Sequence, residues 1–108
     1  MRYFFLLLFV SPALWAQQNF DTVRIVPIKI KENIYMLKGS GGNIGLLTGK
    51  EGNLIIDDQY APLSEKIKAA IESLDKTPIK YLINTHLHGD HTGGNRILGK
   101  NATVICRM

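Results

Sequence analysis

Thr85-His86-Leu87-His88-Gly89-Asp90-His91 is a short stretch that holds all three histidines of this 108-residue chain. Random placement would bring three residues so close together roughly once in 200 chains of this length, so the clustering indicates a site. Gly89, Gly93 and Gly94 allow the backbone to turn tightly here and to bring several side chains toward one point. Imidazole nitrogens and a carboxylate oxygen are ligands that zinc accepts, at about 2.0 to 2.2 Å. The stretch therefore predicts a metal site.

The spacing within the stretch suggests how its ligands divide. His86 and His88 alternate, so they can point to the same side of an extended strand end and reach one metal together. Asp90 and His91 follow the turn at Gly89, so they can face a second metal, or Asp90 can hold the attacking water. Zinc sites usually have three or four protein ligands, and this stretch offers two to each metal. The predicted site is therefore incomplete.

Two other interpretations of the cluster stay open. One is a polar loop whose histidines are satisfied by hydrogen bonds, and the other is a histidine-rich segment that stores metal. Storage segments lack an aspartate such as Asp90 and the ordered glycines around it. This comparison favours a catalytic type of metal site.

The residues before the cluster predict an α/β fold. Four short runs rich in apolar and β-branched residues predict a meander of strands over 24–30, 33–38, 43–48 and 53–57. Pro27 marks the first of them as an edge strand or a bulge. The turn at 39–42 lacks the Lys-Ser/Thr ending of a phosphate loop, which favours a plain hairpin.

A helix and two more strands follow. Pro62 can begin a helix, and Pro78 ends it. Its predicted apolar face consists of Leu63, Ile67, Ala70, Ile71 and Leu74, and its predicted water-facing side of Glu65, Lys66, Lys68 and Glu72. The run 79–84 predicts a strand parallel to the one that ends at Asp57, and 102–105 predicts a last strand. The histidines begin where strand 79–84 ends, which is where open α/β sheets place ligands.

The stretch from Thr85 to Asn95 resembles the His-x-His-x-Asp-His motif of the metallo-β-lactamase superfamily, and the resemblance covers about residues 30 to 105. It implies that this chain forms the N-terminal half of an αββα sandwich with two zinc ions at its edge. By the same resemblance, His86 and His88 bind the first zinc, and Asp90 and His91 bind the second. In the family a hydroxide bridging the zincs attacks the substrate, and Asp90 is the catalytic residue that orients it.

The resemblance also implies residues that support the metal ligands. Asp57 matches the family's aspartate at a strand end, which supports the metal loop, and a carboxylate is suited to orienting a ligating histidine. A simple turn or helix start at Asp57-Asp58 is the alternative. Asn84 and Thr85 are expected to support the backbone beside the ligands.

The N-terminus has the pattern of a secretory signal peptide. Arg2 precedes an apolar run over residues 3–10, then Pro12 and a small-residue end at Ala16. The run is shorter than the roughly 20 residues that a bilayer span needs, although an uncleaved anchor is an alternative. Residues 1–16 are thus predicted as the signal peptide, and 17–108 as a truncated domain of a secreted or periplasmic protein without membrane attachment. The only cysteine, Cys106, cannot form a disulfide within the chain.

Charge and length limit the functions that we expect. The net charge of +4 comes from scattered Lys and Arg, which argues against a nucleic-acid partner. Members of the family are usually more than twice as long, and no histidine follows His91 to supply the family's later ligands. We therefore expect a truncated form whose sheet has an uncovered apolar face or edge, and which is poorly soluble alone.

The resemblance implies a zinc-dependent hydrolase that acts on a small molecule with an ester, thioester, lactone or β-lactam carbonyl. His91 stands where the largest β-lactamase subclass has arginine, so the loop is more similar to histidine-bearing β-lactamases, thioesterases and lactonases. The alternative is a non-catalytic metal-binding fragment or a degenerate remnant. The choice of zinc over iron or manganese, the substrate and the oligomeric state stay open.

Overall fold

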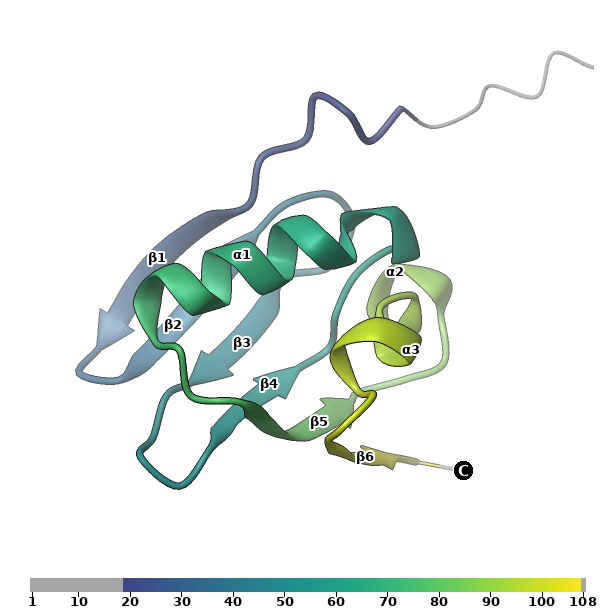
Figure 1. Ribbon diagram of the computed structural model, residues 1–108. Helices are drawn as coiled ribbons and strands as arrows, with labels where there is room; N and C mark the ends of the chain where they lie inside the picture. Colours follow the sequence, from purple (N-terminus) through teal and green to yellow (C-terminus); the bar gives the residue numbers. More distant parts are fainter. Residues whose placement is uncertain (1–18, 108) are drawn as a thin grey trace, which may run out of the picture.

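A six-stranded mixed sheet in the order β1-β2-β3-β4-β5-β6 forms the centre of the molecule (Figure 1). The computed structural model describes residues 19–107, so the predicted signal peptide lies outside the described residues. The strands are β1 Val26–Lys31, β2 Ile34–Lys38, β3 Ile44–Leu47, β4 Asn53–Ile56, β5 Ile79–Asn84 and β6 Thr103–Cys106. Strands β1 to β4 pair antiparallel, and β4, β5 and β6 pair parallel. The predicted meander, the parallel placement of 79–84 and the α/β class are confirmed.

The edge position of β1 agrees with its proline. Pro27 lies in this edge strand, and the register between β1 and β2 shifts between Lys29 and Lys31. An edge strand tolerates proline because the missing N–H need not pair with a neighbour. Of the two alternatives that Pro27 predicts, the edge strand is confirmed, whereas the register shift lies two residues further along.

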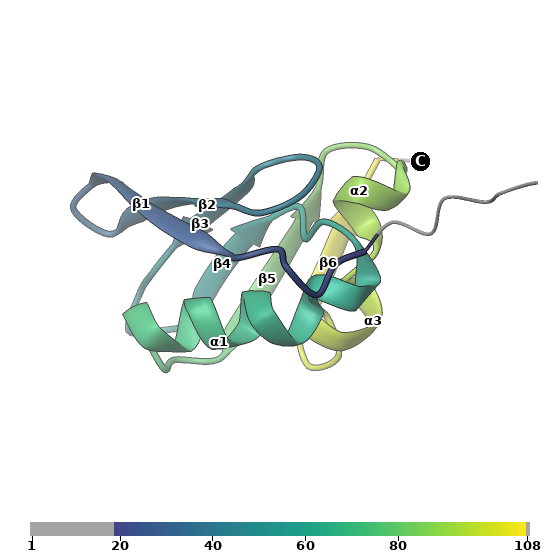
Figure 2. The same ribbon diagram turned by 90° about the horizontal axis from the view of Figure 1, so that it is seen from above.

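The helices pack on one face of the sheet (Figure 2). They are the 3-10 turn η1 Ala61–Leu63 and the α-helices α1 Ser64–Leu74, α2 Gly89–Thr92 and α3 Asn95–Leu98. Pro62 lies in the first turn, where its missing N–H costs nothing. The buried core between α1, α3 and the sheet consists of Leu37, Ile44, Leu46, Ile55, Leu63, Ile67, Ile71, Leu82 and Leu98. Within residues 19–107, no helix has the length and apolar character needed to cross a membrane.

Lys66 departs from the predicted helix pattern. It was predicted to face water, but it is half-buried and its Nζ donates to the backbone oxygens of Phe20, Asp21 and Val23 at 2.9, 3.0 and 2.8 Å. These carbonyls belong to the segment before β1, which forms no strand of its own. A long ammonium side chain can cross the apolar helix surface and satisfy such carbonyls at its tip. Lys66 thereby fastens the N-terminal segment to α1.

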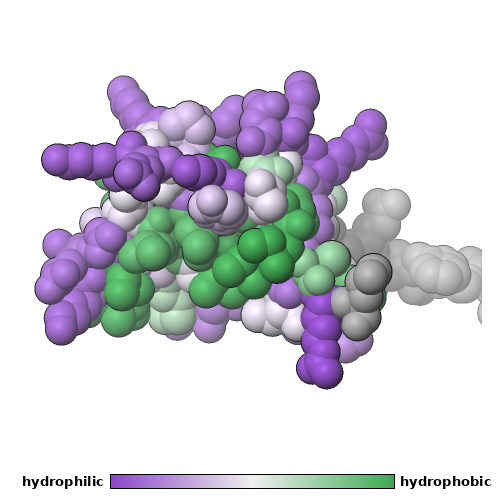
Figure 3. All heavy atoms as spheres, turned by 90° about the horizontal axis from the view of Figure 1, so that it is seen from below, coloured by the Kyte–Doolittle hydropathy of each residue, from purple (hydrophilic) through white to green (hydrophobic). Residues whose placement is uncertain are grey.

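The face of the sheet opposite α1 is largely uncovered. Strand alternation and pairing place Val26, Ile34, Leu47, Ile56, Tyr81 and Ile105 on this face, and they are 38% to 50% exposed. Figure 3 shows hydrophobic side chains gathered into one patch with hydrophilic side chains around it. The expectation of an uncovered apolar face is confirmed.

Candidate metal centre

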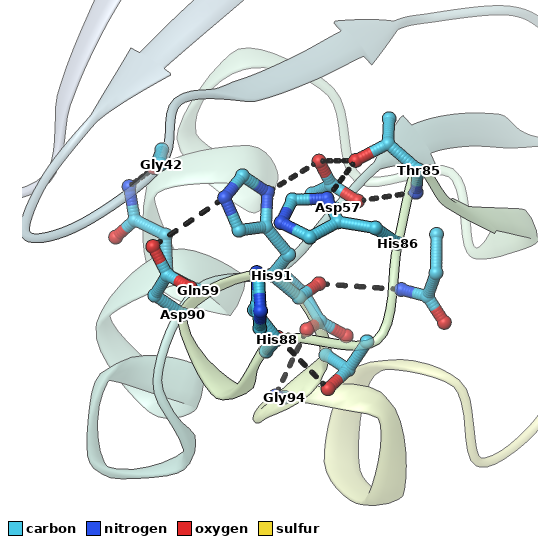
Figure 4. Close-up of polar contacts among 12 residues, drawn as sticks. Gly42, Asp57, Gln59, Thr85, His86, His88, Asp90, His91 and Gly94 are labelled. Atoms are coloured by element: carbon cyan, nitrogen blue, oxygen red, sulfur yellow. Dashed lines mark hydrogen bonds and ion pairs between the residues drawn. The ribbon is translucent and has the colours of Figure 1, made fainter.

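Three loops meet at one edge of the sheet, the edge formed by the carboxyl ends of β2, β4 and β5. The histidine-rich loop follows β5, and Asp57 follows β4, which is parallel to β5. Strand β2 runs in the same direction as β4, because each is antiparallel to β3. The glycine-rich loop after β2, residues 39–43, therefore reaches the same edge, as Figure 4 shows for Gly42. This is the edge at which open α/β sheets hold ligands.

His86, Asp90 and His91 bring three possible metal ligands together. Each offers one donor atom, and the three atoms lie within 4.8 Å of one another. The rings of His86 and His91 have centroids 4.0 Å apart, and His91 Nε2 lies 3.4 Å from Asp90 Oδ2. All three residues are half-buried. Two imidazoles and one carboxylate form a donor set that suits a divalent metal such as zinc.

His88 lies beside this group but outside it. Its exposed ring is edge-on to the ring of His86, with centroids 4.8 Å apart. The structure thus groups His86 with Asp90 and His91, and does not display the predicted division into two pairs. The roles of His86 and His88 on a first zinc, and of Asp90 and His91 on a second, stay predictions.

Asp57 connects the two histidines of this group (Figure 4). Its Oδ1 accepts the Thr85 backbone N–H at 2.8 Å, and its Oδ2 accepts the Thr85 hydroxyl at 2.8 Å and lies 2.7 Å from His91 Nδ1. A carboxylate can only accept, so His91 carries a proton on Nδ1, and in the neutral ring that binds metals the lone pair is then on Nε2. The nitrogen that faces Asp90 is thereby free to bind a metal.

The same reasoning extends through Thr85 to His86. The Thr85 hydroxyl gives its proton to Asp57, so its oxygen accepts from His86 Nδ1, which lies 2.9 Å away. His86 therefore also keeps its lone pair on Nε2. One carboxylate sets the tautomers of two histidines, directly for His91 and through Thr85 for His86. Sequence analysis assigned Asp57 and Thr85 to this supporting position.

Hydrogen bonds keep Asp57 ionised. Burial acts to raise the pKa of this carboxyl, but the hydrogen bonds from Thr85 and His91 outweigh it and hold the pKa below its ordinary value of 3.8. The charged form is the one that the two histidines require. The backbone φ of Asp57 is 63°, in the left-handed region, which aspartate visits more readily than most residues.

Asp58 is a supporting residue that sequence analysis missed. It is fully buried, its N–H donates to the His91 carbonyl at 3.0 Å, and its Oδ1 accepts the Gly94 N–H at 2.9 Å. Its Oδ2 has no hydrogen-bond partner among residues 19–107. Burial raises the pKa of Asp58 to about 7; the Gly94 hydrogen bond opposes this, and the charge of Asp57 adds to it. Asp58 thus holds the backbone within α2, at His91, and just after it, at Gly94.

Gln59 is the second residue that was missed. It is fully buried and makes side-chain hydrogen bonds to the backbone of the glycine-rich loop, at Ser40 and Gly42. A usable signal was present in the sequence, because Asp57, Asp58 and Gln59 are three polar residues directly after an apolar strand. Asn84 behaves as expected, since its side-chain amide donates to the His91 carbonyl at 3.3 Å.

Comparison with known proteins agrees with this geometry. The model of the metallo-beta-lactamase superfamily matches residues 37–105. The chain is 30% identical over 98 residues to the alkyl/aryl-sulfatase BDS1 of Saccharomyces cerevisiae, an alignment that covers 88% of this chain and 15% of that protein.

Solved structures give the same result. BJP-1, a subclass B3 metallo-beta-lactamase of Bradyrhizobium japonicum, is 28% identical with a TM-score of 0.66, over 77% of this chain and 33% of that one. A metallo-beta-lactamase of Cronobacter sakazakii with a HARLDQ motif is 27% identical with a TM-score of 0.67, over 75% and 33%. The chain spans about a third of the length of these solved relatives. Since the family model matches more than half of its residues, the histidine-rich loop included, the chain belongs to the metallo-beta-lactamase superfamily.

Proposed function

We propose that this chain supplies one side of the active site of a zinc-dependent hydrolase for a small molecule with an ester, thioester, lactone or β-lactam carbonyl. The observation that carries the proposal is the convergence of His86, Asp90 and His91 on one point within 4.8 Å. The hydrogen bonds of Asp57 and Thr85 add to it, because they leave the Nε2 atoms of both histidines ready to bind a metal.

The residues of the loop would hold the metal in this proposal. His86, Asp90 and His91 supply its ligands, with His88 beside them for a site that holds two zinc ions. Bound zinc lowers the pKa of a coordinated water toward about 7 and polarises the oxygen under attack. Asp90, whose side chain is 32% exposed, also has the access to solvent needed to accept a hydrogen bond from the attacking water and orient it.

Sulfate esters are a second candidate class of substrate. The similarity to an alkyl/aryl-sulfatase extends over 88% of this chain, so it is not limited to the histidine-rich motif. A metal site that activates water could serve the hydrolysis of either a sulfate ester or a carboxylic ester. A direct comparison of the two kinds of ester can therefore distinguish these candidates.

A non-catalytic metal-binding fragment is the alternative function. Within residues 19–107 the structure gathers three donor atoms into one group, and the chain spans 33% of BJP-1. Three ligands are sufficient to bind zinc, but a complete site for two ions requires more.

Zinc content and hydrolysis, measured on the same preparations, test these proposals. The full chain and the variant Asp90→Asn are loaded with zinc and assayed with nitrocefin, a thioester and an aryl sulfate. Metal analysis after loading with zinc, iron and manganese in competition tests the choice of metal. Zinc binding with turnover that Asp90→Asn abolishes supports a hydrolase, and the preferred substrate selects the class. Zinc binding without turnover supports the metal-binding alternative, and no zinc binding contradicts both.

We also propose export to the periplasm or the outside of the cell, on the basis of the sequence pattern of residues 1–16. The expected mature protein begins at Gln17. N-terminal sequencing of protein from a bacterial host tests this, and an intact Met1 in the mature protein would contradict it.

A further inference from the structure

The glycine-rich loop after β2 lies directly against two of the candidate ligands. A Cβ atom added to Gly42 would lie 2.3 Å from Cε1 and 2.6 Å from Nε2 of His91. A Cβ atom on Gly41, where φ is 86°, would lie 2.9 Å from Cβ of Asp90. Only glycine, which has no Cβ atom, fits at these two positions without a shift of the neighbouring side chains. The added Cβ on Gly42 would also lie 2.9 Å from Nδ1, so the loop forms a close-fitting wall at the end of the His91 ring where Cε1 lies between the two nitrogens.

This loop needs an anchor to stay in place. Glycine loses more conformational freedom on ordering than any other residue, and the loop 39–42 contains three glycines. The side chain of Gln59 provides this anchor. Its Oε1 accepts the Ser40 N–H at 3.3 Å, and its Nε2 donates to the Gly42 carbonyl at 2.5 Å. Because Gln59 is fully buried, water does not compete for these bonds.

Two contacts then restrict His91 from different sides. Asp57 holds the ring at Nδ1, a single hydrogen bond about which the ring can still tilt. Gly42 closes the space around Cε1, between the two nitrogens, which restricts that tilt. With both in place, Nε2 stays directed at the Asp90 carboxylate, 3.4 Å away.

We propose that Gln59 is a positioning residue, which holds the glycine-rich loop against His91 and thereby fixes the direction of the ring's metal-binding nitrogen. Its link to metal affinity rests on the proposed zinc site. Its effect on the ring itself does not, because these contacts involve only the chain's own residues.

The chain offers a matched control for a test of Gln59. Asn53 is also a fully buried amide that fastens loops, since its Oδ1 accepts the Gly49 N–H at 3.2 Å and its Nδ2 donates to the Thr77 carbonyl at 2.9 Å. These partners lie at the opposite end of β4 from Asp57. Gln59→Met and Asn53→Leu each replace a buried amide by an apolar side chain of similar size. Both lose stability, and only the first loosens the loop at His91.

Two measurements on the full chain follow. In the metal-free protein, nitrogen NMR shifts and line widths of the imidazoles report the state of the His91 ring. Gln59→Met should shift or broaden the His91 resonances, and Asn53→Leu should leave them unchanged. In a zinc competition titration, Gln59→Met should weaken binding roughly tenfold, the usual effect of losing a group that orients a ligand.

A second pair of variants tests the same wall if Gln59→Met does not fold. Gly42→Ala inserts a methyl group against the His91 ring, whereas the added Cβ of Gly45→Ala meets Ile56 at an ordinary 3.4 Å. Only Gly42→Ala should alter the His91 resonances. Unchanged His91 resonances in a folded Gln59→Met would overturn the role of Gln59. Unchanged His91 resonances in Gly42→Ala would overturn the contact through which Gln59 is proposed to act, whether or not Gln59→Met folds. A wild-type chain that binds no zinc, but whose His91 resonances respond as expected, would contradict the proposed function and leave the role of Gln59 supported.

Discussion

Replacement of Asp57 by asparagine tests how the site sets its histidine tautomers. Asparagine has nearly the same shape and also tolerates the left-handed backbone at this position, where φ is 63°. Its carbonyl oxygen can still accept the Thr85 N–H. Its NH₂ group, however, would then face the Thr85 hydroxyl and His91 Nδ1. In the wild type, both of these groups donate to Asp57 Oδ2. The variant therefore removes one acceptor at the point where two donors need it.

The expected effect follows from the bonds that are lost. A hydrogen bond to a charged group contributes about 1.5 to 3 kcal/mol, and the His91 bond at 2.7 Å is of this kind. Without it, His91 gains nothing from keeping its proton on Nδ1, and a proton on Nε2 blocks the metal-binding nitrogen. Since about 1.4 kcal/mol corresponds to a factor of ten, zinc affinity should fall roughly 10- to 100-fold.

Competition titration against a zinc chelator measures this change, and Asp75→Asn is the matched control. Asp75 also accepts a backbone N–H, that of Thr77 at 2.7 Å, but it follows the C-terminus of α1, away from the metal loop. Asparagine can keep that bond, so Asp75→Asn should bind zinc like the wild type. Equal zinc affinity of Asp57→Asn and wild type would refute the tautomer argument. Imidazole nitrogen shifts that show His91 protonated on Nε2 in the wild type would refute it as well.

Two further predictions concern stability and solubility. Because the pKa of Asp58 is raised from 3.8 to about 7, the folded metal-free chain keeps a proton that the unfolded chain loses. This stabilisation is complete below about pH 4 and is lost as the pH rises through about 7. The Tm of the wild type should therefore fall between these pH values, and Asp58→Asn should make that fall smaller. Parallel Tm profiles of variant and wild type would contradict this prediction. Ile34 and Leu47 are paired across β2 and β3 on the uncovered face, so Ile34→Glu combined with Leu47→Lys should lower both aggregation and binding of an apolar dye. Unchanged light scattering and dye fluorescence would count against the apolar face as the cause of the poor solubility that we predict.

The sheet could be predicted from the sequence because its causes are local. Short runs of β-branched residues separated by tight turns pair with their neighbours, and the parallel strand 79–84 follows from one amphipathic crossover helix. The uncovered face was expected from the length of the chain relative to members of the family. The strands agree with it, since β2 to β5 are apolar on both sides, as strands between two layers are. Lys66 was the exception, because the path of the segment that it holds leaves no trace in the helical pattern.

The grouping of the metal ligands was harder to predict. His86 and His88 share a side only if the chain stays extended, but β5 ends at Asn84 and the next residues bend. The bend brings His86 toward His91, with ring centroids 4.0 Å apart. Alternation is a rule about strands, and the position at which a strand ends depends on tertiary contacts such as those of Asp57 with Thr85.

Three consecutive residues after β4 connect the parts of the site. Asp57 and Gln59 have φ values of 63° and 57°, so the backbone turns sharply twice and successive side chains point to different segments. Asp57 binds the loop after β5, Asp58 binds Gly94 before α3, and Gln59 binds the loop after β2. Each of these segments is distant in sequence, and each contact is buried or half-buried. The direction of the ligands is therefore determined by the folding of this sheet and its helices, before any metal binds, and the site should keep its arrangement in the metal-free chain.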